Sequence, residues 1–106
     1  MSKSYILDGR DVVEADLPTW AEWFETADRR VAREDIGDAS VSTVFVGIGE
    51  PYDDGTPQLF ETMVFGGSFD QEVARCSTWA EAEAMHRAMC ERVRKAGCGS
   101  ASGGDA

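Results

Sequence analysis

The stretch LFETMVFGG, residues 59–67, constrains the fold more than any other part of the chain. In an extended backbone every second side chain points to the same side. The two sets are Leu59, Glu61, Met63 and Phe65 on one side and Phe60, Thr62 and Val64 on the other. Both sets are largely apolar, so we predict a central strand covered by a helix on at least one side. Glu61 then needs a partner or solvent, because an unpaired buried carboxylate is costly.

Further strand signals lie on both sides of this stretch. SYILDGRDVVEAD, residues 4–16, predicts a hairpin with a type I′ turn at Asp8-Gly9. VSTVFVGIG, residues 41–49, has the β-branched and aromatic alternation of a half-buried strand. A turn at Gly66-Gly67 followed by a short strand over residues 73–76 completes the predicted antiparallel run.

Two segments have helical periodicity. The first is predicted to begin after an N-cap at Asp16 and to end near Arg30, with an apolar stripe at spacings of three and four. That stripe consists of Leu17, Trp20, Phe24, Ala27 and Val31. The second begins with a capping box at Thr78 and Glu81 and is predicted to stop at Gly97. Its stripe consists of Trp79, Ala82, His86, Met89 and Val93, with Met85 and Cys90 alongside.

This order of elements predicts an α+β fold with an antiparallel sheet of about five or six strands and two amphipathic helices packed on one face. The length of 106 residues fits one domain, which we place at residues 1–96. Residues 97–106, CGSASGGDA after the glycine, have the small and polar composition of a disordered tail.

The net charge of −10 is concentrated in one segment. Between Arg33 and Arg75 there are nine acidic and no basic residues, whereas the rest of the chain has eleven acidic and ten basic residues. Such a segment argues against direct binding of nucleic acid and favours a basic partner. The alternative is that the charge only confers solubility. The residues that we expect to contact a partner are Glu50, Asp53, Asp54, Asp70 and Glu72.

Few residues are candidates for chemistry. His86 is the single histidine, and its place on an apolar stripe favours a buried histidine with a satisfied nitrogen. Cys90 follows one turn later, which would bring a thiol near the imidazole, but no orienting carboxylate accompanies the pair in sequence. The loop GEPYDDGTP lacks the ligand alternation of a calcium loop. We therefore expect no catalytic residue, no metal and no cofactor.

The expected location is the cytoplasm of a host cell. The sequence contains no apolar run of about 18 residues, the length that a membrane-spanning helix needs. Its start, MSKSYILDGRD, lacks the basic and then apolar order of a signal peptide. The three cysteines, Cys76, Cys90 and Cys98, lack CxxC spacing, which argues against a disulfide framework and a zinc knuckle.

Four segments together carry a resemblance: ADLPTWAEWFETADRRVA, VSTVFVGIG, LFETMVFGG and CSTWAEAEAMH. In these the chain resembles a widespread family of small, mostly uncharacterised proteins encoded in bacteriophages and prophages. The resemblance covers residues 3–95, and LFETMVFGG is its most specific part. The chain departs from the family in the loop GEPYDDGTP, where the family has an aspartate-histidine pair and a glycine-proline-proline run. The resemblance supplies no site residues.

What the resemblance implies is a setting. Small, acidic accessory proteins of mobile elements include anti-CRISPR and other anti-defence proteins, which block host machinery. The leading hypothesis is therefore a non-enzymatic phage protein that binds and inhibits a host defence nucleoprotein, with partial mimicry of nucleic acid. The alternatives are a phage structural or assembly protein that forms a homodimer or larger oligomer, and an accessory protein that binds a small molecule or acts as a minor enzyme through Cys90 and His86.

Overall fold

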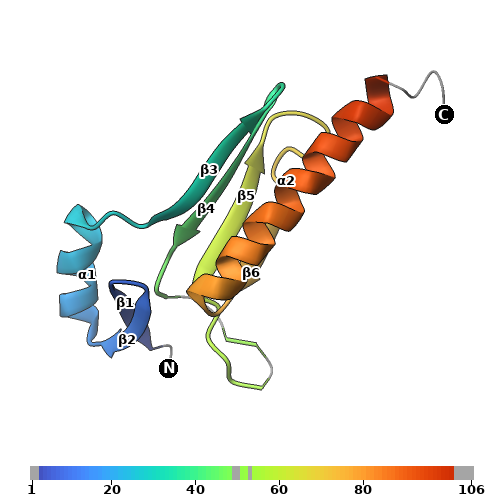
Figure 1. Cartoon of the computed structure of the whole chain (residues 1–106). Coiled ribbons are helices and arrows are strands. Elements are labelled where there is room, and N and C mark those ends of the chain that lie inside the picture. Colours follow the sequence, from blue (N-terminus) through green and yellow to red (C-terminus); the bar gives the residue numbers. More distant parts are fainter. Residues whose placement is uncertain (1–2, 49–50, 53, 102–106) are drawn as a thin grey trace.

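The computed structural model describes residues 3–48, 51–52 and 54–101. Along the chain the elements are β1 (Ser4–Asp8), β2 (Asp11–Ala15), α1 (Leu17–Thr26), β3 (Arg30–Ile36), β4 (Ala39–Phe45), β5 (Phe60–Phe65), β6 (Val73–Cys76) and α2 (Trp79–Ala101). The class is α+β, as predicted. The long helix α2 lies along one face of the larger sheet, and α1 lies with the β1-β2 hairpin beyond one end of that sheet (Figure 1).

The six strands form two antiparallel sheets, so the prediction of a single sheet is wrong. β1 and β2 form a two-stranded sheet, and the other four follow in the order β3-β4-β5-β6. A bridge between Ser4 and Ile48 and a hydrogen bond from the Tyr5 amide to the Gly47 carbonyl (2.7 Å) join the hairpin to the segment after β4. The hairpin is thus attached to the end of the larger sheet without extending it.

The predicted N-terminal hairpin forms with a shifted turn. Asp8 pairs with Asp11, so the two-residue loop is Gly9-Arg10 and not Asp8-Gly9. A type I′ turn at Asp8-Gly9 would need positive φ at both residues, and only Gly9 has it, at 64°. The glycine is therefore the first loop residue, where its freedom is needed.

The first helix is shorter than predicted, and an additional strand follows it. Asp16 caps α1 by accepting a hydrogen bond from the Thr19 amide (2.8 Å), but α1 ends at Thr26. The residues from Arg30 to Ile36 pair with β4 as the edge strand β3. Val31 fits the spacing of the helical stripe, so periodicity alone predicts a helix at a residue that belongs to β3. The β3-β4 connection is the two-residue loop Gly37-Asp38, with φ of 58° at the glycine.

The stretch that opens with Leu59 is a central strand, as predicted. β5 pairs with β4 on one side and β6 on the other, and Phe60, Thr62 and Val64 are buried beneath α2. Glu61 lies on the opposite face, where its carboxylate accepts two hydrogen bonds from Arg75 (2.9 and 3.1 Å) on β6. The partner that this carboxylate needs is therefore supplied by the neighbouring strand.

The second helix begins with the predicted capping box. The Glu81 amide donates to Thr78 Oγ1 (3.2 Å), and the Thr78 amide donates to Glu81 Oε1 (3.1 Å). The helix continues to Ala101, four residues beyond the predicted stop at Gly97, and 102–106 of the predicted tail lie outside the described residues. Within the described chain no helix has the length and apolarity to cross a membrane.

The core between α2 and the larger sheet consists of two apolar clusters with a polar layer between them. One cluster contains Ala39, Val41, Val64, Met89, Cys90 and Val93. The other contains Phe45, Leu59, Phe60 and Ala82. Between them, Thr43 and Thr62 face each other across β4 and β5, and His86 of α2 lies above them. The three polar residues are at most 6% exposed.

A series of aromatic rings connects α1 to α2 through the sheet. Trp23 meets Phe45 edge-on (5.6 Å between ring centroids), Phe45 meets Phe60 (5.0 Å), and Phe60 meets Trp79 (6.1 Å). Edge-to-face pairs of this kind add stability beyond the area that they bury. α1 thus packs mainly on β1 and reaches the sheet with Trp23, whereas the prediction placed both helices on the sheet face.

The junction beside this series depends on a glycine. Gly47 has φ of 72°, and a Cβ there would come within 2.8 Å of both the Phe45 ring and Trp20 Nε1. Trp20 Nε1 also donates a hydrogen bond to the Val46 carbonyl (3.2 Å). The absence of a side chain at Gly47 therefore lets α1 and the hairpin approach the end of β4 closely.

Candidate partner-binding surface

The three predicted contact residues that the structure describes do not lie on one surface. Glu50 and Asp53 lie outside the described residues. Asp54 lies in the loop before β5, whereas Asp70 and Glu72 lie in the loop after it. The six residues of β5 separate these loops by about 20 Å. Residues that are close in a linear charge count are thus at opposite ends of the sheet.

Several acids of the base-free segment are paired with bases from outside it. Arg94 of α2 contacts Glu34 on β3, and Arg92 of α2 contacts Glu72 (3.0 Å). Arg75 of β6 pairs with Glu61. The folded chain therefore brings basic residues of α2 and β6 to carboxylates that are far from them in sequence. Each pair is at least partly exposed, so its contribution to stability is small, but it removes a free negative charge.

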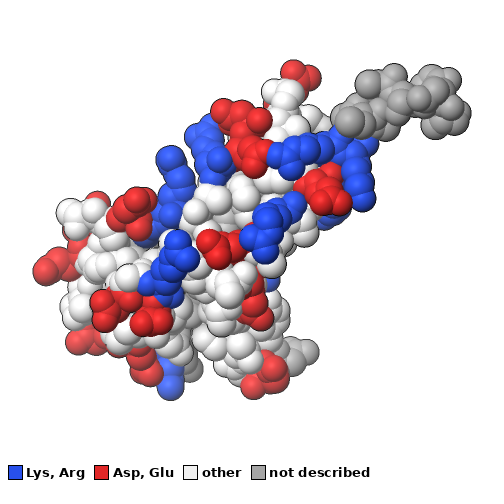
Figure 2. Space-filling model, in the orientation of Figure 1, with Lys and Arg blue, Asp and Glu red and all other residues white. Residues whose placement is uncertain are grey.

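Uncompensated charge gathers instead at the end of the molecule that carries the hairpin and α1. We call the described residues of 3–29 and 51–58 the acidic end, and those of 30–48 and 59–101 the sheet-helix body. The acidic end contains eight acidic and three basic residues, and the body contains nine acidic and seven basic residues. Figure 2 shows red side chains predominating around α1 and the hairpin, with blue and red interleaved along α2.

The bases of the acidic end neutralise few of its acids. Lys3 pairs with Glu14 (3.7 Å), and Arg10 reaches across to Glu83 of α2 (4.0 Å). Arg29 lies over the Phe24 ring (3.7 Å) and donates to the Phe45 carbonyl (3.4 Å), so it serves the junction with the body. Within the described part of the chain, seven exposed carboxylates of this end form no ion pair, and four of the seven also accept no hydrogen bond: Asp8, Asp11, Glu22 and Glu25.

Two further carboxylates of the acidic end are held by local hydrogen bonds. Hydrogen bonds from Thr19, first from its side chain and then from its amide, lower the pKa of Asp16 below its ordinary 3.8. Asp54 Oδ1 accepts from the Thr56 amide (2.9 Å), and this bond lowers the pKa of Asp54 in the same way. Both groups are therefore negatively charged at neutral pH.

The histidine and cysteine that the sequence singled out lie in the polar layer of the body. His86 Nδ1 is 2.8 Å from Thr43 Oγ1, and His86 Nε2 is 3.5 Å from Cys90 Sγ. Burial lowers the pKa of His86 below 6.5 and raises the pKa of the Cys90 thiol above 9.0. At neutral pH both groups are therefore uncharged. The prediction of a buried histidine with a satisfied ring nitrogen is confirmed.

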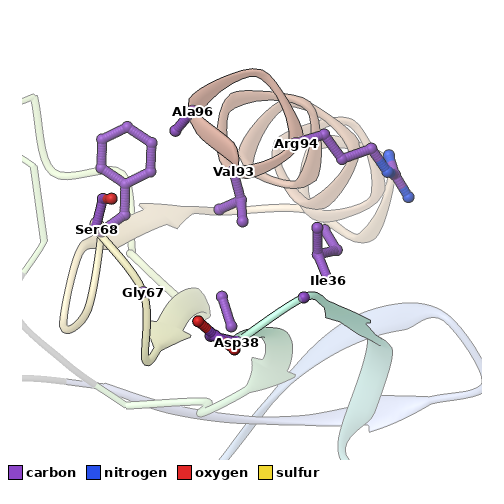
Figure 3. A pocket seen from close by; sticks show the side chains of 10 residues that line it. Ile36, Asp38, Gly67, Ser68, Val93, Arg94 and Ala96 are labelled. Atoms are coloured by element: carbon purple, nitrogen blue, oxygen red, sulfur yellow. The ribbon is translucent and has the colours of Figure 1, made fainter. Parts of the chain in front are cut away.

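A pocket of about 370 Å³ opens at the other end of the body, between the last turns of α2 and two loops (Figure 3). Val93 points into it and Ile36 forms part of its wall, whereas the Arg94 side chain extends away from it. Asp38 lies at its floor beside Gly67. The pocket is thus mainly apolar and lies apart from the acidic end.

Sequence reasoning missed the acids of the hairpin and α1 because it counted charge along the chain. A signal was present: residues 3–29 contain seven acids and three bases, and helical periodicity already placed Glu22 and Glu25 on the outer face of a helix. No local signal could have paired Glu34 with Arg94, since that contact depends on how α2 crosses β3.

Comparison with protein-family models, with curated proteins and with solved structures finds no match for this chain.

Proposed function

We propose that this protein is a non-enzymatic binding protein whose acidic end docks on a basic surface of a partner protein. The observation that carries the proposal is the uneven pairing of carboxylates. Among the described residues, six of the nine carboxylates of the body form ion pairs, whereas Glu14 alone of the eight in the acidic end does, and Asp8, Asp11, Glu22 and Glu25 have no base paired with them. A surface of one sign raises the local concentration of partners of opposite sign and speeds their association.

The arrangement of the acidic end supports a protein partner. Its carboxylates project from a hairpin and a helix that are fixed to the body by the Trp23-Phe45 contact and by the Tyr5-Gly47 hydrogen bond. A fixed array loses little conformational entropy on binding, which favours affinity. Leu17, 57% exposed, and Val13, 42% exposed, supply apolar surface among the charges. Charged rims around apolar contacts are typical of protein interfaces.

The partner that we propose is a nucleic-acid-binding complex of a host defence system. Such complexes hold nucleic acid in channels lined by lysine and arginine, which an array of carboxylates can occupy in place of phosphates. The resemblance to phage and prophage proteins supports this setting. On this proposal Asp54, with Glu50 and Asp53 of the same loop in sequence, belongs to the contact region. Asp70 and Glu72 lie outside it.

Charge reversal at the two ends tests the proposal. The variant Glu22→Lys/Glu25→Lys/Asp54→Lys changes the acidic end, and Asp38→Lys/Asp70→Lys/Glu91→Lys makes the same change of charge on the body. Tagged proteins are used for affinity capture from a host lysate at low and moderate salt, followed by mass spectrometry and by titration of the purified partner. We expect the first variant to weaken binding by about tenfold or more and the second to have little effect.

Circular dichroism and thermal unfolding of both variants show whether the fold is retained, as the exposure of all six residues predicts. Equal loss of binding in the two variants would mean that net charge alone matters. Undiminished binding by the first variant would contradict the proposal, as would capture that moderate salt does not weaken.

A second candidate function is self-assembly through the sheet face that α2 does not cover. Val44, Met63 and Phe65 lie on that face, and Phe65 is 51% exposed beside Val73, which is 38% exposed. Exposed apolar side chains on a strand near a sheet edge are a common basis for association. Light scattering of the wild type and of Phe65→Ser/Val73→Ser at high concentration tests it: a monomeric wild type would exclude this candidate.

A further inference from the structure

Three side chains with metal-binding atoms meet where β3 passes beneath α2. They are Glu34 of β3 and His86 and Cys90 of α2, and one ligand atom from each lies within 4.8 Å of the other two. His86 and Cys90 are buried, at 6% and 1% exposure. The group combines an imidazole, a thiol and a carboxylate, which are the three ligand types that Zn²⁺ takes in proteins.

The geometry of the two helical ligands fits a tetrahedral ion. Zn²⁺ binds sulfur at about 2.3 Å and imidazole nitrogen at about 2.0 to 2.1 Å, which in a tetrahedron places the two ligand atoms about 3.6 Å apart. In the structure His86 Nε2 and Cys90 Sγ are 3.5 Å apart. Their spacing of four residues puts both on one helical face, as in other zinc sites built on a helix.

The polar layer supplies the support that a histidine ligand needs. A ligating imidazole usually donates its other N–H to a fixed acceptor, which sets the tautomer and the ring orientation. Thr43 Oγ1 lies 2.8 Å from His86 Nδ1 and can accept that hydrogen bond while donating to Thr62 Oγ1, 2.5 Å away. This tautomer leaves the lone pair of Nε2 directed toward Cys90.

Glu34 provides the third ligand from the solvent side. Its side chain is 41% exposed and contacts Arg94, which extends outward from α2. Because all ligand atoms lie within 4.8 Å of one another and tetrahedral ligands are about 3.4 to 3.6 Å apart, the carboxylate has to move by only about 1 Å. Three protein ligands leave the fourth position for a water molecule on this exposed side.

We propose that Glu34, His86 and Cys90 bind one Zn²⁺ ion and thereby fasten the edge strand β3 to α2. On binding, the Cys90 thiol releases its proton to solvent and Glu34 exchanges Arg94 for the metal. The site lies in the sheet-helix body and is independent of the proposed docking of the acidic end. The proposal differs from the expectation of no metal. That expectation is based on residues close in sequence, and Glu34 lies beside α2 only in the folded chain.

Cobalt and zinc titrations of the chelator-treated full chain test the site. A Cys76→Ser/Cys98→Ser background leaves Cys90 as the single cysteine. We expect one equivalent of Co²⁺ to give a thiolate charge-transfer band and the d–d absorption of a tetrahedral ion, and one equivalent of Zn²⁺ to displace it. In that background Cys90→Ser should abolish the band, and Glu34→Gln should weaken binding by about tenfold or more.

Two further variants separate the site from general binding of cations. Arg94→Ala removes the competitor of the metal for Glu34 and should tighten binding, whereas Glu91→Gln, also on α2, should leave it unchanged. Thr43→Val should weaken binding through His86 while the thiolate band persists. Absence of the band in the Cys76→Ser/Cys98→Ser protein, a band that survives Cys90→Ser, or equal affinity of wild type and Glu34→Gln would overturn the proposal. Because Glu34 is partly exposed, its variant should fold even if the core variants do not.

Discussion

The sheet-helix body and the acidic end differ in how their carboxylates are paired with basic side chains. In the sheet-helix body, Glu34, Glu61 and Glu72 each lie beside an arginine of α2 or β6. In the acidic end, basic side chains are few, and Arg29 is directed into the junction with the body. The difference shows that a sequence rich in acids can fold into a nearly balanced body and a strongly anionic end. The total charge of −10 alone describes neither region.

The largest expected effect comes from breaking the junction between the two regions. Phe45 is fully buried and contacts Trp23 on one side and Phe60 on the other. Phe45→Ala should lower the free energy of unfolding by about 3 to 5 kcal/mol, because it removes a core ring and leaves a cavity. Denaturant unfolding measures this loss. Phe65→Ala, at a position 51% exposed, is the matched control and should change stability by about 0.5 kcal/mol or less.

A smaller effect is the pH dependence of the free energy of unfolding, in which His86 of the polar layer and the aspartates act at different pH values. Burial holds the pKa of His86 below 6.5, so on acidification the unfolded chain takes up this proton before the folded chain does. Stability should be full above pH 6.5 and fall as the pH drops from there to the lower folded pKa, with a slope of at most about 1.4 kcal/mol per pH unit. The measurement is made in the presence of a chelator, because a metal ion bound by His86, Glu34 and Cys90 would compete with the proton for the imidazole.

His86→Gln is the control for the pH experiment, and denaturant unfolding at several pH values should show a flatter profile for it. The aspartates of lowered pKa, Asp16, Asp35 and Asp54, contribute to stability above 3.8 and lose that contribution only at more acidic pH. An unchanged slope between wild type and His86→Gln near pH 6 would show that the histidine is not responsible.

The smallest effect compares one carboxylate from each region. Glu61→Gln weakens two hydrogen bonds from Arg75 to a side chain only 22% exposed, and should cost up to about 1 kcal/mol. Glu22→Gln, at an exposed site of α1 without an ion pair among the described residues, should be neutral or slightly stabilising, because it relieves repulsion within the acidic end. Thermal unfolding of both variants measures the difference. Similar losses in the two would remove the distinction between the regions.

Local signals predicted several elements of this fold. The alternation of residues 60–65, the Thr78-Glu81 capping box and the strand at 73–76 all depend on neighbours in sequence, and the structure confirms each. β3 was missed because Val31 fits the helical stripe before it, although the Gly37-Asp38 loop is a hairpin signal. The division into two sheets and the approach of Glu34 to α2 depend on packing between distant segments, for which no local pattern exists.

The series of rings from Trp23 to Trp79 also provides intrinsic spectroscopic signals that report on the junction. Trp20 and Trp23 belong to α1, and Trp79 begins α2, so all three indoles of the chain adjoin the junction. Near-ultraviolet circular dichroism of indoles depends on fixed contacts with other rings, and their emission depends on exposure to water. Undocking of α1 from the end of β4 would therefore alter both signals without an attached label, even if every helix and strand remained intact.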